Sequence, residues 1–132
     1  MLALPSIFLA ALATIPLGFL WYSPLFFAAP WMKMNAISTK KMKDGPGVMP
    51  FFFTLLTSLV LASLMSLLIG FLNIATLTDA WKIGTMLWFG FDFLPSLTRS
   101  LFSKRPLALV LIDSGHQAAN ILLIAWILML SK

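Results

Sequence analysis

The chain has 132 residues, of which 61% are hydrophobic and 10% charged; it contains no cysteine, has a net charge of +5 and has a mean hydropathy of +0.99. Soluble domains are about half apolar and about a quarter charged, so this composition excludes an ordinary water-soluble fold and predicts one membrane domain over residues 1–132. The lack of cysteine excludes disulfides, zinc–thiolate sites and iron–sulfur clusters. The basic residues lie beside apolar segments, which indicates that they set the membrane topology and argues against a nucleic-acid partner.

Four apolar stretches follow one another, at about residues 4–29, 48–73, 78–102 and 106–130. Each is long enough for the roughly 20 helical residues that cross a bilayer core. The first has no Lys or Arg before it, so we interpret it as a retained helix and not as a signal peptide. We therefore predict an all-α integral membrane protein, a bundle of four transmembrane helices in two antiparallel hairpins with short loops.

Prolines predict irregularities inside two of these helices. Pro16 and Pro24 predict a kink or an unwound inner end in the first, and Pro95 predicts the same in the third. The Asp-Gly-Pro-Gly sequence at residues 44–47 marks the connection between the first and second helices.

Basic residues gather in the first and third connections, whereas the second has only Asp79 and Lys82. Loops rich in Lys and Arg stay on the cytoplasmic side. We therefore predict that connections 1–2 and 3–4 are cytoplasmic and that both chain termini are outside. The basic residues concerned are Lys33, Lys40, Lys41 and Lys43, set against Asp44, and then Arg99, Lys104 and Arg105.

Small side chains recur every four residues along the second helix, and a shorter run of them lies on the first. Such strips let a neighbouring backbone approach closely. We predict that the two strips pack the first and second helices together, with a dimer interface as the alternative. The residues are Thr54, Ser58, Ala62, Ser66 and Gly70 in the second helix, and Ala10, Thr14 and Gly18 in the first.

Polar side chains line one side of the fourth helix, at Asp113, His116, Gln117 and Asn120. Their spacing places them within about 100° of the helix circumference. Because such groups are costly against lipid tails, we expect this stripe to face the bundle interior or another subunit.

The third helix adds Asp92 and Arg99 to this polar cluster. Folding the hairpin about its turn brings Asp92 level with His116, and it brings Arg99 within reach of Asp113. We therefore expect these two pairs to form.

The cluster has three interpretations. It either joins the third and fourth helices, or forms a proton or small-ion path through Asp92, Asp113 and His116, or places His116 as an axial ligand of haem or a chlorophyll-type pigment. We predict no catalytic residue, because Ser114 and His116 point to different sides of the helix. A single histidine also argues against a metal site, and only the third interpretation needs a cofactor.

Residues 18–26, Gly-Phe-Leu-Trp-Tyr-Ser-Pro-Leu-Phe, followed by Trp31-Met32, resemble the opening signature of a bacterial family, domain of unknown function 1761. The resemblance continues through residues 88–91, then Leu101-Phe102 with Arg105-Pro106, and residues 111–115, and so spans nearly the whole chain. This chain departs from the family pattern at Ser103, where an acid is common, and at His116-Gln117, where an aromatic residue and a histidine are common. The resemblance implies a small four-helix protein of the bacterial inner membrane and supplies no catalytic residues.

We expect a non-catalytic helical subunit that packs with itself or with a larger membrane complex, such as a pigment- or redox-containing one. Its partners would be membrane lipid, a second copy of the chain or other membrane subunits. The alternative is a small proton-coupled transporter or channel that uses Asp92, Asp113 and His116.

Overall fold

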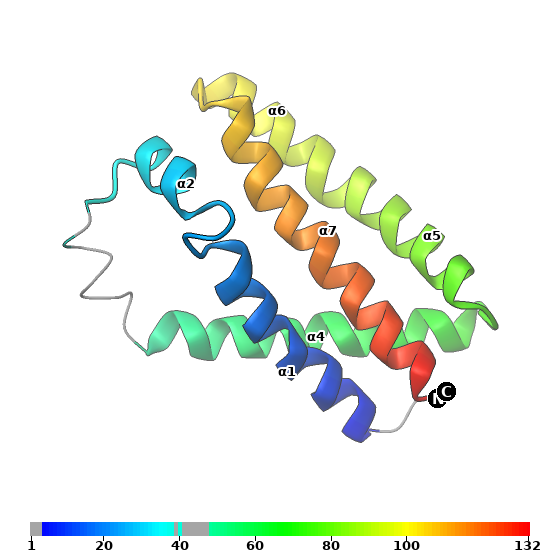
Figure 1. The fold of residues 1–132 in the computed structure, drawn as a ribbon. Helices are drawn as coiled ribbons and strands as arrows, with labels where there is room; N and C mark the ends of the chain where they lie inside the picture. Colours follow the sequence, from blue (N-terminus) through cyan, green and yellow to red (C-terminus); the bar gives the residue numbers. More distant parts are fainter. Residues whose placement is uncertain (1–3, 39, 41–47) are drawn as a thin grey trace.

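The computed structural model describes residues 4–38, 40 and 48–132, and within these the chain is helical and has no strand (Figure 1). The predicted break at residues 44–47 and the charges of Lys41, Lys43 and Asp44 lie outside the described residues. The elements in chain order are α1 (Leu4–Trp21), α2 (Ala28–Met34), α4 (Met49–Phe71), α5 (Leu77–Trp88), the π-helix η1 (Phe89–Phe93), α6 (Leu94–Ser103) and α7 (Leu107–Leu130).

Three of the described helices, α1, α4 and α7, are long and apolar enough to cross a membrane. This finding confirms the all-helical prediction for the described residues and is consistent with a membrane protein. The predicted third helix, residues 78–102, is divided into α5, η1 and α6, and neither α-helical part reaches a membrane-spanning length by itself.

The core lies around α7, which packs against α1, α4 and α5. In Figure 1 the axes of α1, the α5–α6 segment and α7 have a similar inclination, with α7 running opposite to the other two, while α4 crosses them obliquely. Ile124 and Leu128 of α7 are fully buried, and Met65 and Ile69 of α4 belong to the same apolar cluster. In a bilayer such side chains hold helices together by close van der Waals packing, because lipid tails are as apolar as the side chains themselves.

Small residues let α1 and α4 approach closely. The Thr14 and Ser58 hydroxyls form a hydrogen bond of 2.9 Å between the two helices, and Ala10 lies in the same buried cluster as Ala62. Of the five small residues predicted to pack along α4, three are buried, whereas the outermost two are exposed. The buried ones are Ser58, Ala62 and Ser66, and the exposed ones are Thr54 and Gly70.

The predicted first helix, residues 4–29, is not continuous. It ends at Trp21, a turn occupies residues 22–27, and the short helix α2 follows. Pro24 lies within this turn, whereas Pro16 remains inside α1. A proline lacks the N–H group that continues a helix, so Pro24 favours the break.

A π-turn precedes Pro95. The Leu94 N–H donates to the Phe89 carbonyl, five residues back instead of four. An α-helix would press the proline ring against the carbonyl four residues before it, and the wider turn relieves this contact. Residues 77–103 therefore stay helical throughout, and the expected irregularity at Pro95 takes the form of η1.

Two turns with a left-handed residue connect the later helices. Asn73, at φ 52°, follows α4, and the Ile74 N–H donates to the Ile69 carbonyl across the turn. Lys104, at φ 55°, ends α6, and the Arg105 N–H donates to the Ser100 carbonyl. These hydrogen bonds satisfy carbonyls that the helix ends leave free and so permit short connections.

Candidate functional site

Asp113, in the first half of α7, accepts two side-chain hydrogen bonds from the segment that follows α1. The Tyr22 hydroxyl donates to Oδ1 at 2.7 Å, and the Trp31 indole Nε1 donates to the same oxygen at 3.0 Å. The two donor rings also contact each other, with centroids 5.2 Å apart. One carboxylate therefore fastens both the turn at residues 22–27 and α2 to α7.

Trp21 attaches the end of α1 to the same part of α7. Its indole Nε1 donates to the Ile112 carbonyl at 2.9 Å. A Cβ atom at Gly115 would lie 3.2 Å from Cζ2 of this ring. The glycine therefore provides the space in which the indole lies flat against the helix.

A second group of side chains connects α7 to α5 and η1. The Ser114 hydroxyl donates to Asp92 Oδ2 at 2.6 Å. The Trp88 indole Nε1 lies 2.6 Å from the Ser114 carbonyl oxygen and 3.1 Å from its hydroxyl oxygen, and it donates to both. Asp113 and Ser114 thus hold α7 from two sides, one through the aromatic residues of α1–α2 and the other through those of α5–η1.

His116 lies between the aromatic residues at the end of α1. Its ring centroid is 5.2 Å from that of Tyr22 and 6.1 Å from that of Trp21. Its Nε2 atom is buried and has no hydrogen-bond partner. A Cβ atom added to Gly18 would lie 3.5 Å from this nitrogen, so the α1 backbone lies directly beside it.

This position does not fit an axial ligand of a haem or chlorophyll-type ring. A flat macrocycle bound to Nε2 would need the space that the Gly18 backbone occupies. The space beside Gly115 on α7 is taken by the ring of Trp21. Within the described residues, no group of three or more His, Cys, Asp or Glu side chains is placed to hold a metal ion.

The two expected pairs, Asp92 with His116 and Arg99 with Asp113, do not form. Asp92 accepts from Ser114, while the Arg99 guanidinium donates to Ser96 at 3.3 Å. Over residues 4–38, 40 and 48–132, the only ion pair joins Lys82 to Asp79 at 3.4 Å. The predicted charged partners of Asp92 and Asp113 were wrong, because uncharged side chains donate to both carboxylates.

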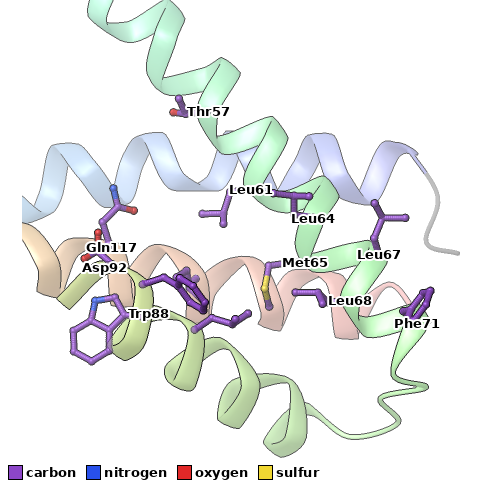
Figure 2. A pocket seen from close by; sticks show the side chains of 13 residues that line it. Thr57, Leu61, Leu64, Met65, Leu67, Leu68, Phe71, Trp88, Asp92 and Gln117 are labelled. Carbon is purple, nitrogen blue, oxygen red and sulfur yellow. The ribbon is translucent and has the colours of Figure 1, made fainter. Parts of the chain in front are cut away.

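The other two members of the predicted stripe differ in their surroundings. Asn120 is buried, and its Oδ1 atom has no hydrogen-bond partner. Gln117 is exposed on the helix surface, next to Asp92 (Figure 2). The stripe is therefore divided between the bundle interior and an outer face.

A polar cavity of about 290 Å³ lies between α6 and α7 at the basic end of the molecule. Arg99, Arg105 and Asp113 line it together with Ser114 and the serines of α6. Arg105 also donates to Asn35 Oδ1 at 3.3 Å, which connects this end to the residues after α2. Arg99 therefore shares a cavity with Asp113, although the two side chains do not pair.

Sequence reasoning missed the donors of this site: Trp21, Tyr22, Trp31, Trp88 and Ser114. A buried indole N–H or phenol hydroxyl usually finds an acceptor, and the four aromatic donors lie inside predicted apolar segments or near their ends. The need of these aromatic groups for acceptors could therefore have indicated the site, but a residue such as Trp31 fits an interfacial aromatic belt equally well. In this site Asp113 accepts from two aromatic donors, Asp92 accepts from Ser114, and two further indoles donate to carbonyl groups of α7, so that these hydrogen bonds connect α7 to its neighbours.

A family model with the description "Protein of unknown function (DUF1761)" matches residues 5–129. No curated protein matches the chain. No solved structure matches it either.

Proposed function

Because the chain belongs to the family of proteins of unknown function DUF1761, which assigns it no activity, we propose its function from its own geometry. The protein is a four-span, non-catalytic integral membrane protein that acts as a helical subunit, packed with itself or with a larger membrane complex. Three spans are α1, α4 and α7, and residues 77–103 supply the fourth. At about 1.5 Å per residue, this continuous helical segment is about 40 Å long, enough to cross a bilayer.

The observation that carries the proposal is the use of the polar groups inside the chain. Asp113 accepts two hydrogen bonds, Asp92 accepts one from Ser114, and both Trp21 and Trp88 donate to carbonyls of α7. In a bilayer such contacts hold helices together at about 0.6–2 kcal/mol each. Groups used in this way hold α7 to the neighbouring helices, which supports a structural role for them.

The outer surface supports a role among other membrane components. Large apolar side chains are exposed on α1 and α4, among them Phe8, Phe19, Phe52 and Leu64. The connections at residues 72–76 and 104–106 are too short to form a soluble domain. Lipid tails or neighbouring helices are therefore the surroundings that this surface requires.

We place the protein in a bacterial inner membrane with both termini outside. Lys33 lies at the end of α2, and Arg99, Lys104 and Arg105 surround the α6–α7 turn, near which α2 lies in Figure 1. Positive charge at this end supports a cytoplasmic location for it.

Native mass spectrometry of the chain, extracted from its own membrane in a mild detergent, tests this function. We expect a species larger than the monomer, containing either a second copy or other membrane subunits. An absorbance spectrum recorded on the same sample identifies any pigment or redox partner. A protein that emerges only as a monomer with lipid, at all detergent concentrations that keep it folded, would contradict the subunit role.

A second candidate function, proton-coupled transport, is favoured by the surroundings of His116. The buried Nε2 atom of His116 has no hydrogen-bond partner, and its ring lies beside Tyr22, the donor to Asp113. An imidazole in this position is the group that would take up and release protons in a transporter. The polar cavity beside Asp113 offers a route for water from the basic end.

The His116→Phe variant, which keeps a ring but removes the titrating group, distinguishes the two functions. For a structural subunit we expect unchanged proton flux per folded molecule in proteoliposomes. Asp79→Asn, at an exposed acid outside the cluster, is the matched control. If the parent protein carries a proton flux that His116→Phe abolishes and Asp79→Asn preserves, the function is transport and not that of a structural subunit.

A further inference from the structure

A wide apolar groove separates α4 from α5, η1 and α7. Its volume is about 810 Å³, and its walls include Leu61, Leu64, Leu68 and Phe71 from α4, with Leu87 and Trp88 opposite. Figure 2 shows the α4 side chains and Trp88 along the groove. Sites for small molecules have volumes of about 300–1,000 Å³ and mostly apolar walls, so the groove has the size and lining of a ligand site.

One end of the groove is polar. Asp92 and Gln117 lie together at this end, whereas Phe71 lies at the other (Figure 2). The Asp92 Oδ2 atom accepts from Ser114, and no described residue forms a hydrogen bond with Asp92 Oδ1 or with the Gln117 amide. An amide donor and a carboxylate acceptor therefore meet at the end of an otherwise apolar channel.

The polar end is far from both ends of the spanning segment. Asp92 is fifteen residues after Leu77 and eleven before Ser103, which correspond to about 22 Å and about 16 Å along a helix. At this depth of a bilayer no bulk water is present, and an unpaired amide or carboxyl oxygen costs several kcal/mol. These groups require a polar partner that reaches them through the apolar groove.

We propose that the groove binds a neutral long-chain amphiphile, a molecule with one hydroxyl-bearing head on an aliphatic or isoprenoid tail. The head lies between Asp92 and Gln117, because a hydroxyl group donates to the carboxylate and accepts from the amide at the same time. The tail follows the α4 leucines toward Phe71. This inference rests on the membrane location of the proposed function.

The depth of the polar end excludes an ordinary phospholipid as the occupant. A phospholipid bound with its head at Asp92 would bring a charged phosphate to the middle of the bilayer, which is far more costly than an uncharged hydroxyl. A phospholipid with its head at the surface would leave the Gln117 amide facing hydrocarbon. An uncharged head small enough to be buried satisfies both conditions.

Photolabelling of the full-length protein in vesicles tests the inference. The probe is palmityl alcohol with a diazirine in its tail, and the comparison probe is a phosphatidylcholine with the same diazirine in its palmitoyl chain. We expect the alcohol to label α4 peptides within the groove more strongly than the phosphatidylcholine does. The Gln117→Leu variant removes one hydrogen bond to the head and is expected to reduce alcohol labelling about fivefold.

Two matched variants test whether the tail occupies the groove. Leu67, in the groove wall, and Leu111, outside it on α7, are each 54% exposed. Leu67→Trp narrows the groove and is expected to reduce alcohol labelling, while Leu111→Trp leaves it unchanged. Equal labelling by both probes, unchanged labelling in Gln117→Leu, or cross-linking of the groove to a second copy of the chain would overturn the inference.

Alkaline carbonate extraction of the same vesicles separates this inference from the proposed function. A chain that stays in the membrane fraction but fails the labelling test contradicts only the amphiphile site. A chain released by carbonate contradicts the membrane location and, with it, both proposals.

Discussion

The Asp113→Leu variant is expected to lose about 2–4 kcal/mol of stability, because two donors lose their shared acceptor. The Tyr22 hydroxyl and the Trp31 indole N–H would then be left half-buried without a partner. Leucine keeps the branching of aspartate but is larger, so a methyl group also crowds the Tyr22 hydroxyl, which lies 2.7 Å from the oxygen that it replaces. Thermal unfolding in mild detergent, followed by tryptophan fluorescence, measures the loss.

Asp113→Asn is the matched control, since the amide retains an acceptor oxygen for one or both donors. We expect it to lose clearly less stability than Asp113→Leu, and Tyr22→Phe, which removes one of the two hydrogen bonds, to lose an intermediate amount. Hydrogen exchange should increase in residues 22–35 of the leucine variant before it does so in α4. Equal stability of Asp113→Leu and the parent protein would show that this carboxylate does not hold the segment.

Gly84→Ala is expected to destabilise the contact between α5 and α7 by about 1–3 kcal/mol, because extra atoms in a packed core force the backbone apart. A Cβ atom at this glycine would lie 2.7 Å from Cγ2 of Ile121, closer than real contacts allow. Ile121 lies in the core, and its Cγ2 atom moves only with a rotation about χ1, which is costly because isoleucine has one strongly preferred χ1 rotamer in a helix. Chemical or thermal unfolding of the purified variant measures the effect.

Gly90→Ala is the matched control for this prediction, because nothing lies within 4 Å of a Cβ atom at that position. It should leave stability unchanged or raise it slightly, as alanine is favoured over glycine in helices by up to about 1 kcal/mol. In the Gly84→Ala background, Ile121→Leu removes the clashing methyl group and should restore part of the loss. If the two glycine variants are equally stable, α5 and α7 are not packed closely enough at Gly84 to exclude a methyl group.

Hydrophobic length alone predicted α4 and α7 within one or two residues. The expected ranges were 48–73 and 106–130, and the observed helices are Met49–Phe71 and Leu107–Leu130. Both are uniformly apolar, and a left-handed residue or a proline marks the adjoining turns. Local sequence is therefore sufficient to define these two helices.

The end of the first helix could not be placed in this way. Tyr22 in the turn and Trp31 in α2 both donate to Asp113. This residue lies 91 positions after Tyr22 and 82 positions after Trp31 in the chain. Pro24 indicated an irregularity, but its local pattern did not show where α2 begins, and the contact with Asp113 comes only from the fold. The apolar composition of residues 4–29 concealed the break.

For the candidate site, the sequence indicated which part of α7 matters but not which residues contact it. Asp113 and His116 contact the residues at the end of α1, whereas Gln117 faces the groove beside α4. The polar stripe of α7 is therefore divided between these two surfaces. Charge pairing guided the expected contacts, yet Tyr22, Trp31 and Ser114 provide the actual donors. Uncharged donors carry no pairing signal in a single sequence, and their geometry comes only from the fold.

The π-turn at Phe89–Phe93 also makes this segment sensitive to its length. Such a turn contains one residue more than an α-turn, and one residue corresponds to about 100° of rotation. Deleting a single residue there would rotate Trp88 relative to α6 and move its indole away from Ser114, even if every remaining residue were kept. Apart from Asp92, which accepts from Ser114, the segment Phe89–Phe93 should therefore accept substitutions but no change in the number of residues. A gap in this stretch, in any sequence aligned with it, would mark a chain with a differently built site.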